Sequence, residues 1–199
     1  KPVIAHGLQS MSIGYLVDET SPMVWRGPMV TQALEQLLKN TEWNDIDYMI
    51  VDLPPGTGDT QLTLSQKIPV SGAVIVTTPQ DIALIDAQKG LSMFEKVNIP
   101  ILGIVENMSM HLCSNCGHIE EIFGKGGGQE MADNTDTNFL GALPLQQDIR
   151  ADVDEGTPTV IKNPESSAAL IYHEIARKIA ATLSLQSETT GAFPNITIE

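Results

Sequence analysis

Short apolar runs alternate along the chain with longer stretches in which apolar residues recur every three or four positions. Three of the runs, residues 48–51, 73–78 and 100–106, are nearly continuous in their apolar character. Such runs are typical of strands that are buried on both faces of a parallel sheet. The segments 3–8, 11–17 and 139–144 are also apolar, and we expect them to add further strands.

Four stretches between these runs are predicted to be helices, and all but the second have an apolar face at helical spacing. They are residues 30–38, 59–68, 81–97 and 164–185. In the third of them, Asp81 is the expected N-terminal cap. The alternation of strands and helices predicts an α/β fold, with a doubly wound, mainly parallel sheet and flanking helices.

Composition and charge narrow the class of protein. The 199 residues are 42% hydrophobic, which fits one globular domain, expected at residues 1–185 with a flexible tail at 186–199. A net charge of −14 argues against a nucleic-acid or anionic-membrane surface, since both need a basic face. No apolar run is long enough to cross a membrane, and the first residues do not resemble a signal peptide. The cytoplasm is the default expectation, and a mitochondrial version would need an N-terminal transit segment.

Asp52 follows the apolar run 48–51 and precedes a Pro/Gly turn. Open α/β sheets bind their ligands at the carboxyl ends of the strands, and a carboxylate there suits a magnesium ion. Gly56 and Gly58 would let backbone N–H groups approach a phosphate. The alternative is an ordinary strand followed by a turn.

Cys113 and Cys116 form a Cys-x-x-Cys motif flanked by His111 and His118. This spacing leaves three possibilities open. The two thiolates could be half of a cluster site that a second subunit completes. They could form a zinc site that also uses the histidines, or they could be a redox dithiol.

Two further features lie near this motif. Residues 123–128 are rich in glycine and include Lys125, but no Ser or Thr follows that lysine, so we interpret the segment as a flexible hinge and not as a phosphate loop. Asn107 ends the predicted strand 100–106. Its amide could pair with the edge of adenine, or it could simply cap the strand.

Six segments together carry a resemblance to a known family. They are residues 25–28 (Trp-Arg-Gly-Pro), 52–59 (Asp-Leu-Pro-Pro-Gly-Thr-Gly-Asp), 78–80 (Thr-Pro-Gln), 105–109 (Val-Glu-Asn-Met-Ser), the Cys-x-x-Cys motif and 143–145 (Leu-Pro-Leu). The chain resembles the Mrp/ApbC family of P-loop ATPases, which are iron–sulfur cluster carriers related to MinD and the nitrogenase iron protein. The resemblance covers nearly all of the chain up to about Leu185.

The resemblance implies roles for particular residues. Asp52 would be the switch-II aspartate near Mg²⁺, and Gly56 would meet the γ-phosphate of ATP. Asn107, with the loop around Pro144, would hold the adenine. Cys113 and Cys116 would bind a [4Fe–4S] cluster that bridges a homodimer. ATP binding and hydrolysis would be coupled to transfer of the cluster to apo iron–sulfur proteins.

The chain departs from the family pattern in one respect. Members carry a deviant Walker A P-loop (the SIMIBI type) and a switch-I aspartate upstream of these segments, and this sequence contains neither. We therefore expect a C-terminal portion of the ATPase domain, with little ATP hydrolysis on its own. The alternative is a MinD- or ParA-like positioning ATPase with a zinc or non-functional Cys-x-x-Cys. The helix at 164–185 lacks the basic face that binds membrane in the MinD class, which counts against this alternative.

Overall fold

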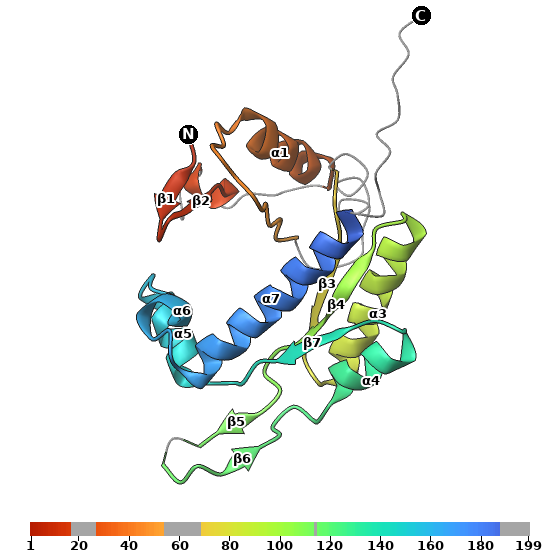
Figure 1. Cartoon of the computed structure of the whole chain (residues 1–199), viewed down its shortest axis with the longest axis vertical. Coiled ribbons are helices and arrows are strands. Elements are labelled where there is room, and N and C mark those ends of the chain that lie inside the picture. The colour runs from red at the N-terminus through yellow and green to blue at the C-terminus, as the bar shows by residue number, and fades with distance from the viewer. Residues whose placement is uncertain (17–26, 54–68, 114, 188–199) are drawn as a thin grey trace, which may run out of the picture. The chain divides into compact units, whose positions relative to one another are not determined.

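The computed structural model describes residues 1–16, 27–53, 69–113 and 115–187. It divides into two compact units, Lys1–Pro69 and Val70–Glu199, which we describe separately. Figure 1 shows the elements of both units with their labels. In the described part of the chain, no helix combines the length and the apolar character that crossing a bilayer requires.

A parallel sheet forms the centre of the second unit. Its strands are β3 (Ala73–Thr77), β4 (Ile101–Glu106) and β7 (Phe139–Ala142), in the order β3-β4-β7. Thr77 is aligned with Glu106, and Glu106 with Ala142, so the carboxyl ends of all three strands meet at one edge. These strands confirm the predictions at 73–78, 100–106 and 139–144 and the α/β class.

Helices cover both faces of this sheet (Figure 1). On one side α3 (Asp81–Lys96) and α4 (Gly127–Asn134) pack on β3 and β4. On the other side α7 (Ser167–Ser187) packs on β4 and β7, and it confirms the helix predicted at 164–185. The helix predicted at 81–97 is confirmed too, but its N-cap is Gln80, and Asp81 lies in the first turn, where its charge complements the helix dipole.

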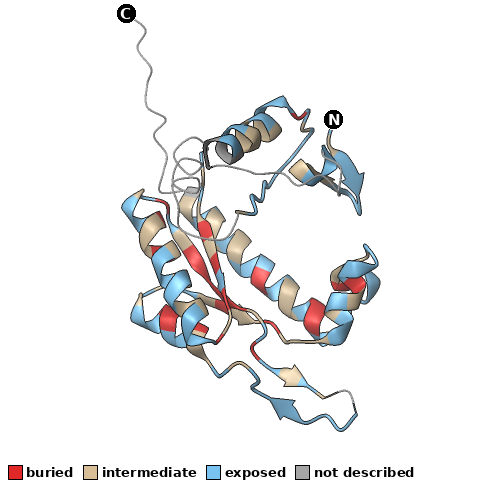
Figure 2. Ribbon diagram, turned by 180° about the vertical axis from the view of Figure 1, so that it is seen from behind, coloured by how far each residue is buried: buried red, intermediate tan, exposed pale blue. Residues whose placement is uncertain are grey.

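The core lies between the sheet and these helices (Figure 2). Val105, Leu140 and Leu143 from the strand region pack against Ile175 of α7. Gly141 permits the close approach of α7, because a Cβ there would lie 3.0 Å from Cγ1 of Ile175. The contact between α7 and the sheet therefore fixes where the carboxyl ends of β4 and β7 lie.

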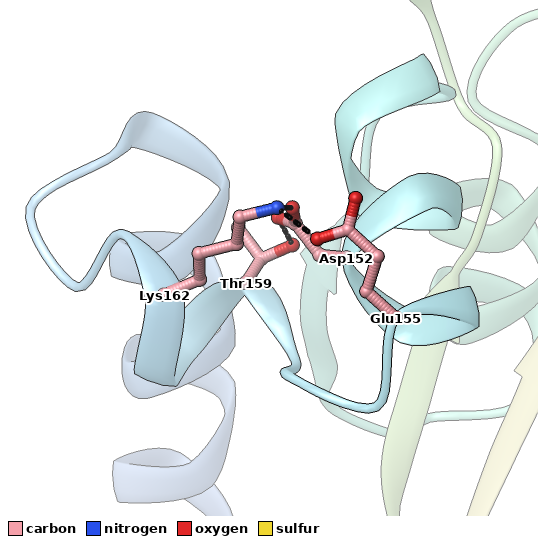
Figure 3. Close-up of polar contacts among 4 residues, drawn as sticks. All are labelled: Asp152, Glu155, Thr159 and Lys162. Atoms are coloured by element: carbon pink, nitrogen blue, oxygen red, sulfur yellow. Dashed lines mark hydrogen bonds and ion pairs between the residues drawn. The ribbon is translucent and has the colours of Figure 1, made fainter.

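Two short helices that the sequence analysis did not predict lie between β7 and α7: α5 (Gln147–Asp154) and α6 (Thr159–Lys162). Buried Asp152 joins them (Figure 3). Its carboxylate accepts a hydrogen bond of 2.7 Å from the Thr159 hydroxyl and pairs with Lys162 Nζ at 2.9 Å. Lys162 also pairs with Glu155 at 2.7 Å.

The described residues of the first unit include a hairpin and a long helix. Strands β1 (Val3–Ala5) and β2 (Leu8–Ser10) pair in antiparallel fashion around a turn in which His6 and Gly7 have positive φ. Next come the 3-10 helix η1 (Ile13–Tyr15) and α1 (Gly27–Asn40), which confirms the helix predicted at 30–38. The prediction of sheet strands at 3–8 and 11–17 was wrong: the turn folds the first segment back on itself, and the described part of the second, residues 11–16, contains η1.

The strand predicted at 48–51 is also absent from the structure. These residues have no regular secondary structure, and Ile50 is 93% exposed. A strand of this kind needs a paired neighbour and covering helices. Within the described residues of the first unit, β1 and β2 pair with each other. The helix predicted at 59–68 lies outside the described residues.

Candidate functional site

Two of the residues predicted to contact the nucleotide lie at the carboxyl edge of the parallel sheet in the second unit. Asn107 directly follows β4, and its N–H donates to the carbonyl of Thr77 at 2.7 Å. Its side-chain Oδ1 accepts from the N–H of Met108 at 2.9 Å, and Met108 has a positive φ of 55°. Pro144 follows β7, half-buried, two residues beyond its end. This edge is where ligands of open α/β sheets bind.

The chain beyond Asn107 continues alongside the segment that contains Pro144. Ser109 N–H donates to the Leu143 carbonyl at 3.0 Å, and Leu145 N–H donates to the Met110 carbonyl at 2.7 Å. His111 then forms a parallel bridge with Leu145, and its Nδ1 lies 3.1 Å from the Leu145 carbonyl oxygen. The segment that leads to the cysteines is therefore hydrogen-bonded to both neighbours of Pro144.

The two cysteines lie at the tip of a hairpin that extends beyond the sheet edge (Figure 1). Its arms are β5 (His111–Leu112) and β6 (Ile119–Glu120), in antiparallel register. Cys113 N–H donates to the His118 carbonyl, and Gly117 N–H donates to the Cys113 carbonyl, both at 2.9 Å. Gly117 has a φ of +71°, which a glycine adopts without strain. This turn brings the Cys113 and Cys116 side chains within hydrogen-bonding reach of each other.

The turn favours the thiolate form of Cys113. Main-chain N–H groups of Cys116 and Asn115, and then the Cys116 side chain, donate hydrogen bonds to its sulfur and lower the pKa of the Cys113 thiol. The thiolate is the form of cysteine that binds metals. Cys116 is exposed, and both cysteines are free of disulfides. Among the described residues, no group of three or more His, Cys, Asp or Glu converges in a way that could hold a metal ion.

The base of the cysteine hairpin is held by a residue that the sequence analysis did not single out. Glu106 is buried, and its Oε2 accepts a hydrogen bond of 2.6 Å from the N–H of Gly128. Gly128 belongs to the first turn of α4, so the interpretation of residues 123–128 as a flexible hinge was wrong at its C-terminal end. The signal available in the sequence was a lone acidic residue at the end of an otherwise apolar strand.

Asp52 and Gly56 belong to the first unit. Asp52 is exposed and follows a segment without regular structure, while Gly56 lies outside the described residues. The structure thus brings Asn107, Pro144 and the cysteine hairpin together in the second unit. The roles of all six predicted residues remain predictions.

Comparison with known proteins identifies the family. A family model described as a ParA, NUBPL iron-transfer P-loop NTPase matches residues 1–180. The chain belongs to this family. The iron-sulfur cluster carrier protein of Salmonella typhimurium is 60% identical over 94% of this chain and 51% of its own length. The iron-sulfur cluster transfer protein NUBPL of mouse is 50% identical over 94% of this chain and 59% of its own length. The chain therefore spans about half the length of the curated relatives that it matches.

Solved structures agree with the P-loop NTPase fold of this family. A nucleotide-binding protein from Archaeoglobus fulgidus, solved in complex with ADP, is 33% identical with a TM-score of 0.68, over 83% of this chain and 63% of its own. The cell division ATPase MinD of Pyrococcus furiosus is 21% identical with a TM-score of 0.57, over 78% and 59%. At that identity, the likeness to MinD concerns the fold alone.

Proposed function

We propose that this chain is the cluster-binding part of an iron–sulfur cluster carrier, in which Cys113 and Cys116 of two copies hold one [4Fe–4S] cluster. The observation that carries the proposal is the hairpin tip, where hydrogen bonds from main-chain N–H groups stabilise the Cys113 thiolate beside an exposed Cys116. Two thiolates are half of the four that such a cluster takes, so a homodimer would complete the set. Relatives that are 50–60% identical are named as carriers or transfer proteins of such clusters.

We further propose that the intact protein binds ATP with Mg²⁺ and passes the cluster to apo iron–sulfur proteins in the cytoplasm. Asn107 and the loop around Pro144 would contact the adenine, Asp52 would lie near Mg²⁺, and Gly56 near the γ-phosphate. The position of Asn107 and Pro144 at the carboxyl edge of the sheet supports the adenine contact. The archaeal relative solved with ADP supports nucleotide binding.

Anaerobic reconstitution of the chain with iron and sulfide tests the cluster proposal. We expect about two irons per chain and a coloured dimer, since four irons would be shared by two copies. Cys113→Ala and Cys116→Ala should each abolish colour and dimer. His118→Ala is the matched control, because His118 is exposed on the same hairpin and should leave the iron content unchanged.

Adding zinc alone to the same preparation distinguishes a zinc site from a cluster site. A monomer that binds zinc through both cysteines, and neither iron nor sulfide, would contradict the cluster proposal. Iron that stays bound in both cysteine variants would contradict it as well, because the cysteines would then not be the ligands.

A further inference from the structure

Glu106 precedes the cysteine hairpin and is hydrogen-bonded to two segments that follow it in the chain. Its main-chain oxygen accepts from the N–H of Leu143 at 2.8 Å, next to Pro144. Its side-chain Oε2 accepts from the N–H of Gly128 at 2.6 Å, in the first turn of α4. The side chain is only 3% exposed, so this second bond is made away from solvent.

The main chain of Gly128 packs directly against the side chain of Glu106. A Cβ on Gly128 would lie 2.9 Å from the Cβ of Glu106 and 3.1 Å from its Oε2, closer than packed atoms come. The absence of a side chain at position 128 lets the carboxylate reach the main chain there. A buried N–H that loses its acceptor is costly, so the Glu106 carboxylate holds the start of α4 against the end of β4.

The cysteine hairpin lies within the stretch of chain between Glu106 and Gly128. This stretch leaves the sheet at Asn107, next to Glu106, and returns to the fold at Gly128, which the Glu106 side chain binds. One residue therefore holds the departing and the returning chain together at the base of the hairpin. The same residue is adjacent in sequence to Asn107, the proposed adenine contact.

We propose that Glu106 is a positioning residue for the cluster: its hydrogen bond to Gly128 fixes the base of the hairpin, and through it the placement of Cys113 and Cys116. This inference rests on the proposed cluster function. Loss of the hydrogen bond should let the two arms of the hairpin separate at their base. The cluster would then be held less firmly, although both thiolates remain.

Two variants of nearly equal length separate the hydrogen bond from packing. Glu106→Gln keeps an acceptor oxygen that can reach Gly128, whereas Glu106→Met keeps the length without a strong acceptor. Thr159→Ala is the control for general loss of stability. It removes a buried hydrogen bond of 2.7 Å to Asp152 in the same unit, between α5 and α6.

Wild type and each variant are reconstituted with iron and sulfide under anaerobic conditions, and two properties are measured. The first is the rate at which a ferrous-iron chelator removes the iron, and the second is the visible circular dichroism of the cluster. We expect Glu106→Met to lose iron about tenfold faster with an altered spectrum, the factor that corresponds to one hydrogen bond at the upper end of the ordinary range. Glu106→Gln and Thr159→Ala should stay close to wild type in both.

Hydrogen exchange of the metal-free proteins gives a readout that does not need the cluster. The N–H groups of Cys113 and Gly117 are hydrogen-bonded within the turn, and we expect both to exchange faster in Glu106→Met only. If wild type bound no iron, the proposed function would fail, and the exchange data would still decide the role of Glu106. The inference is overturned if Glu106→Met behaves as wild type in exchange, if Thr159→Ala shows equal acceleration, or if Glu106→Gln fails to restore the wild-type rate.

Discussion

The imidazole Nδ1 of His111 lies 3.1 Å from the main-chain oxygen of Leu145, a residue 34 positions further along the chain. This contact joins the first arm of the cysteine hairpin to the segment that follows β7. In the tautomer that carries its proton on Nδ1, the histidine donates this hydrogen bond. It is one of the contacts through which the region around Pro144 can affect the position of the cysteines.

His111→Ala should loosen the first arm of the hairpin without unfolding the protein. One hydrogen bond contributes about 1 kcal/mol, so we expect the Cys113 amide to exchange about fivefold faster. Hydrogen-exchange mass spectrometry on the metal-free protein measures this. His118→Ala, on the exposed second side of the turn, should leave the exchange unchanged. Equal acceleration in both variants would mean that the Leu145 contact has no particular effect.

The Cys113 thiol should ionise at a lower pH in the folded protein than in the unfolded chain, because main-chain N–H groups stabilise its thiolate. Single-thiol proteins make this measurable: in Cys116→Ser, the rate of alkylation by iodoacetamide is followed against pH. We expect its midpoint below the value of about 8.5 for a free cysteine, and a return to that value in urea. Identical midpoints with and without urea would refute the role of the turn.

Gly128→Ala should destabilise the protein by about 1–3 kcal/mol, the range for forcing an extra group into a packed site. The new Cβ would lie 2.9 Å from the Cβ of Glu106. Gly90→Ala is the matched control, since it lies within α3 and a Cβ there meets nothing within 4 Å. It should raise stability by about 0.5–1 kcal/mol, because alanine favours the helix. Urea unfolding followed by circular dichroism compares the two. A stabilising Gly128→Ala would show that the close approach is not needed.

The stabilising contribution of Asp152 should be lost in acid. Lys162 and Thr159 donate hydrogen bonds to its carboxylate and lower its pKa below the ordinary value. The stabilisation is therefore complete above the unfolded-state pKa of about 4, and it disappears as the pH falls through the lower pKa of the folded state.

Thermal unfolding of Asp152→Asn across pH tests this. At neutral pH we expect a midpoint a few degrees below wild type, and the difference should shrink towards zero as the pH falls below 4. Asp154→Asn is the control, since its pair with Arg150 is exposed and should contribute little at any pH. A gap between Asp152→Asn and wild type that stays constant in acid would contradict the assignment.

The hydrophobic pattern was sufficient to predict the strands and the long helices of the second unit. In α3 the spacing of Leu91 and Phe94 matches the face that is buried. The same rule failed at residues 48–51, where an apolar run is exposed. An apolar run shows that a segment can be buried, but burial depends on neighbours that the run does not encode.

The parts of the site that were not predicted are either very short elements or depend on contacts distant in sequence. Strands β5 and β6 have two residues each, too few for an alternating pattern to be visible. Helix α4 begins with Gly127 and Gly128, which disfavour helix, and the Glu106 carboxylate stabilises that start. Local preference indicated a hinge, and a tertiary hydrogen bond overrode it.

The separation of His111 from Leu145 has a consequence for the order of folding. A hairpin spanning residues 111–120 closes between near neighbours, and hairpins form within about 1–10 μs. Parallel pairing of β4 with β7 must close a far longer loop, which is slower. The two thiols therefore meet before the sheet edge that orients them exists. Because a lone hairpin is barely stable, any metal that binds at that stage stabilises it. Until β7 has docked, the cysteine turn lacks the contacts with Leu143 and Leu145 that orient it.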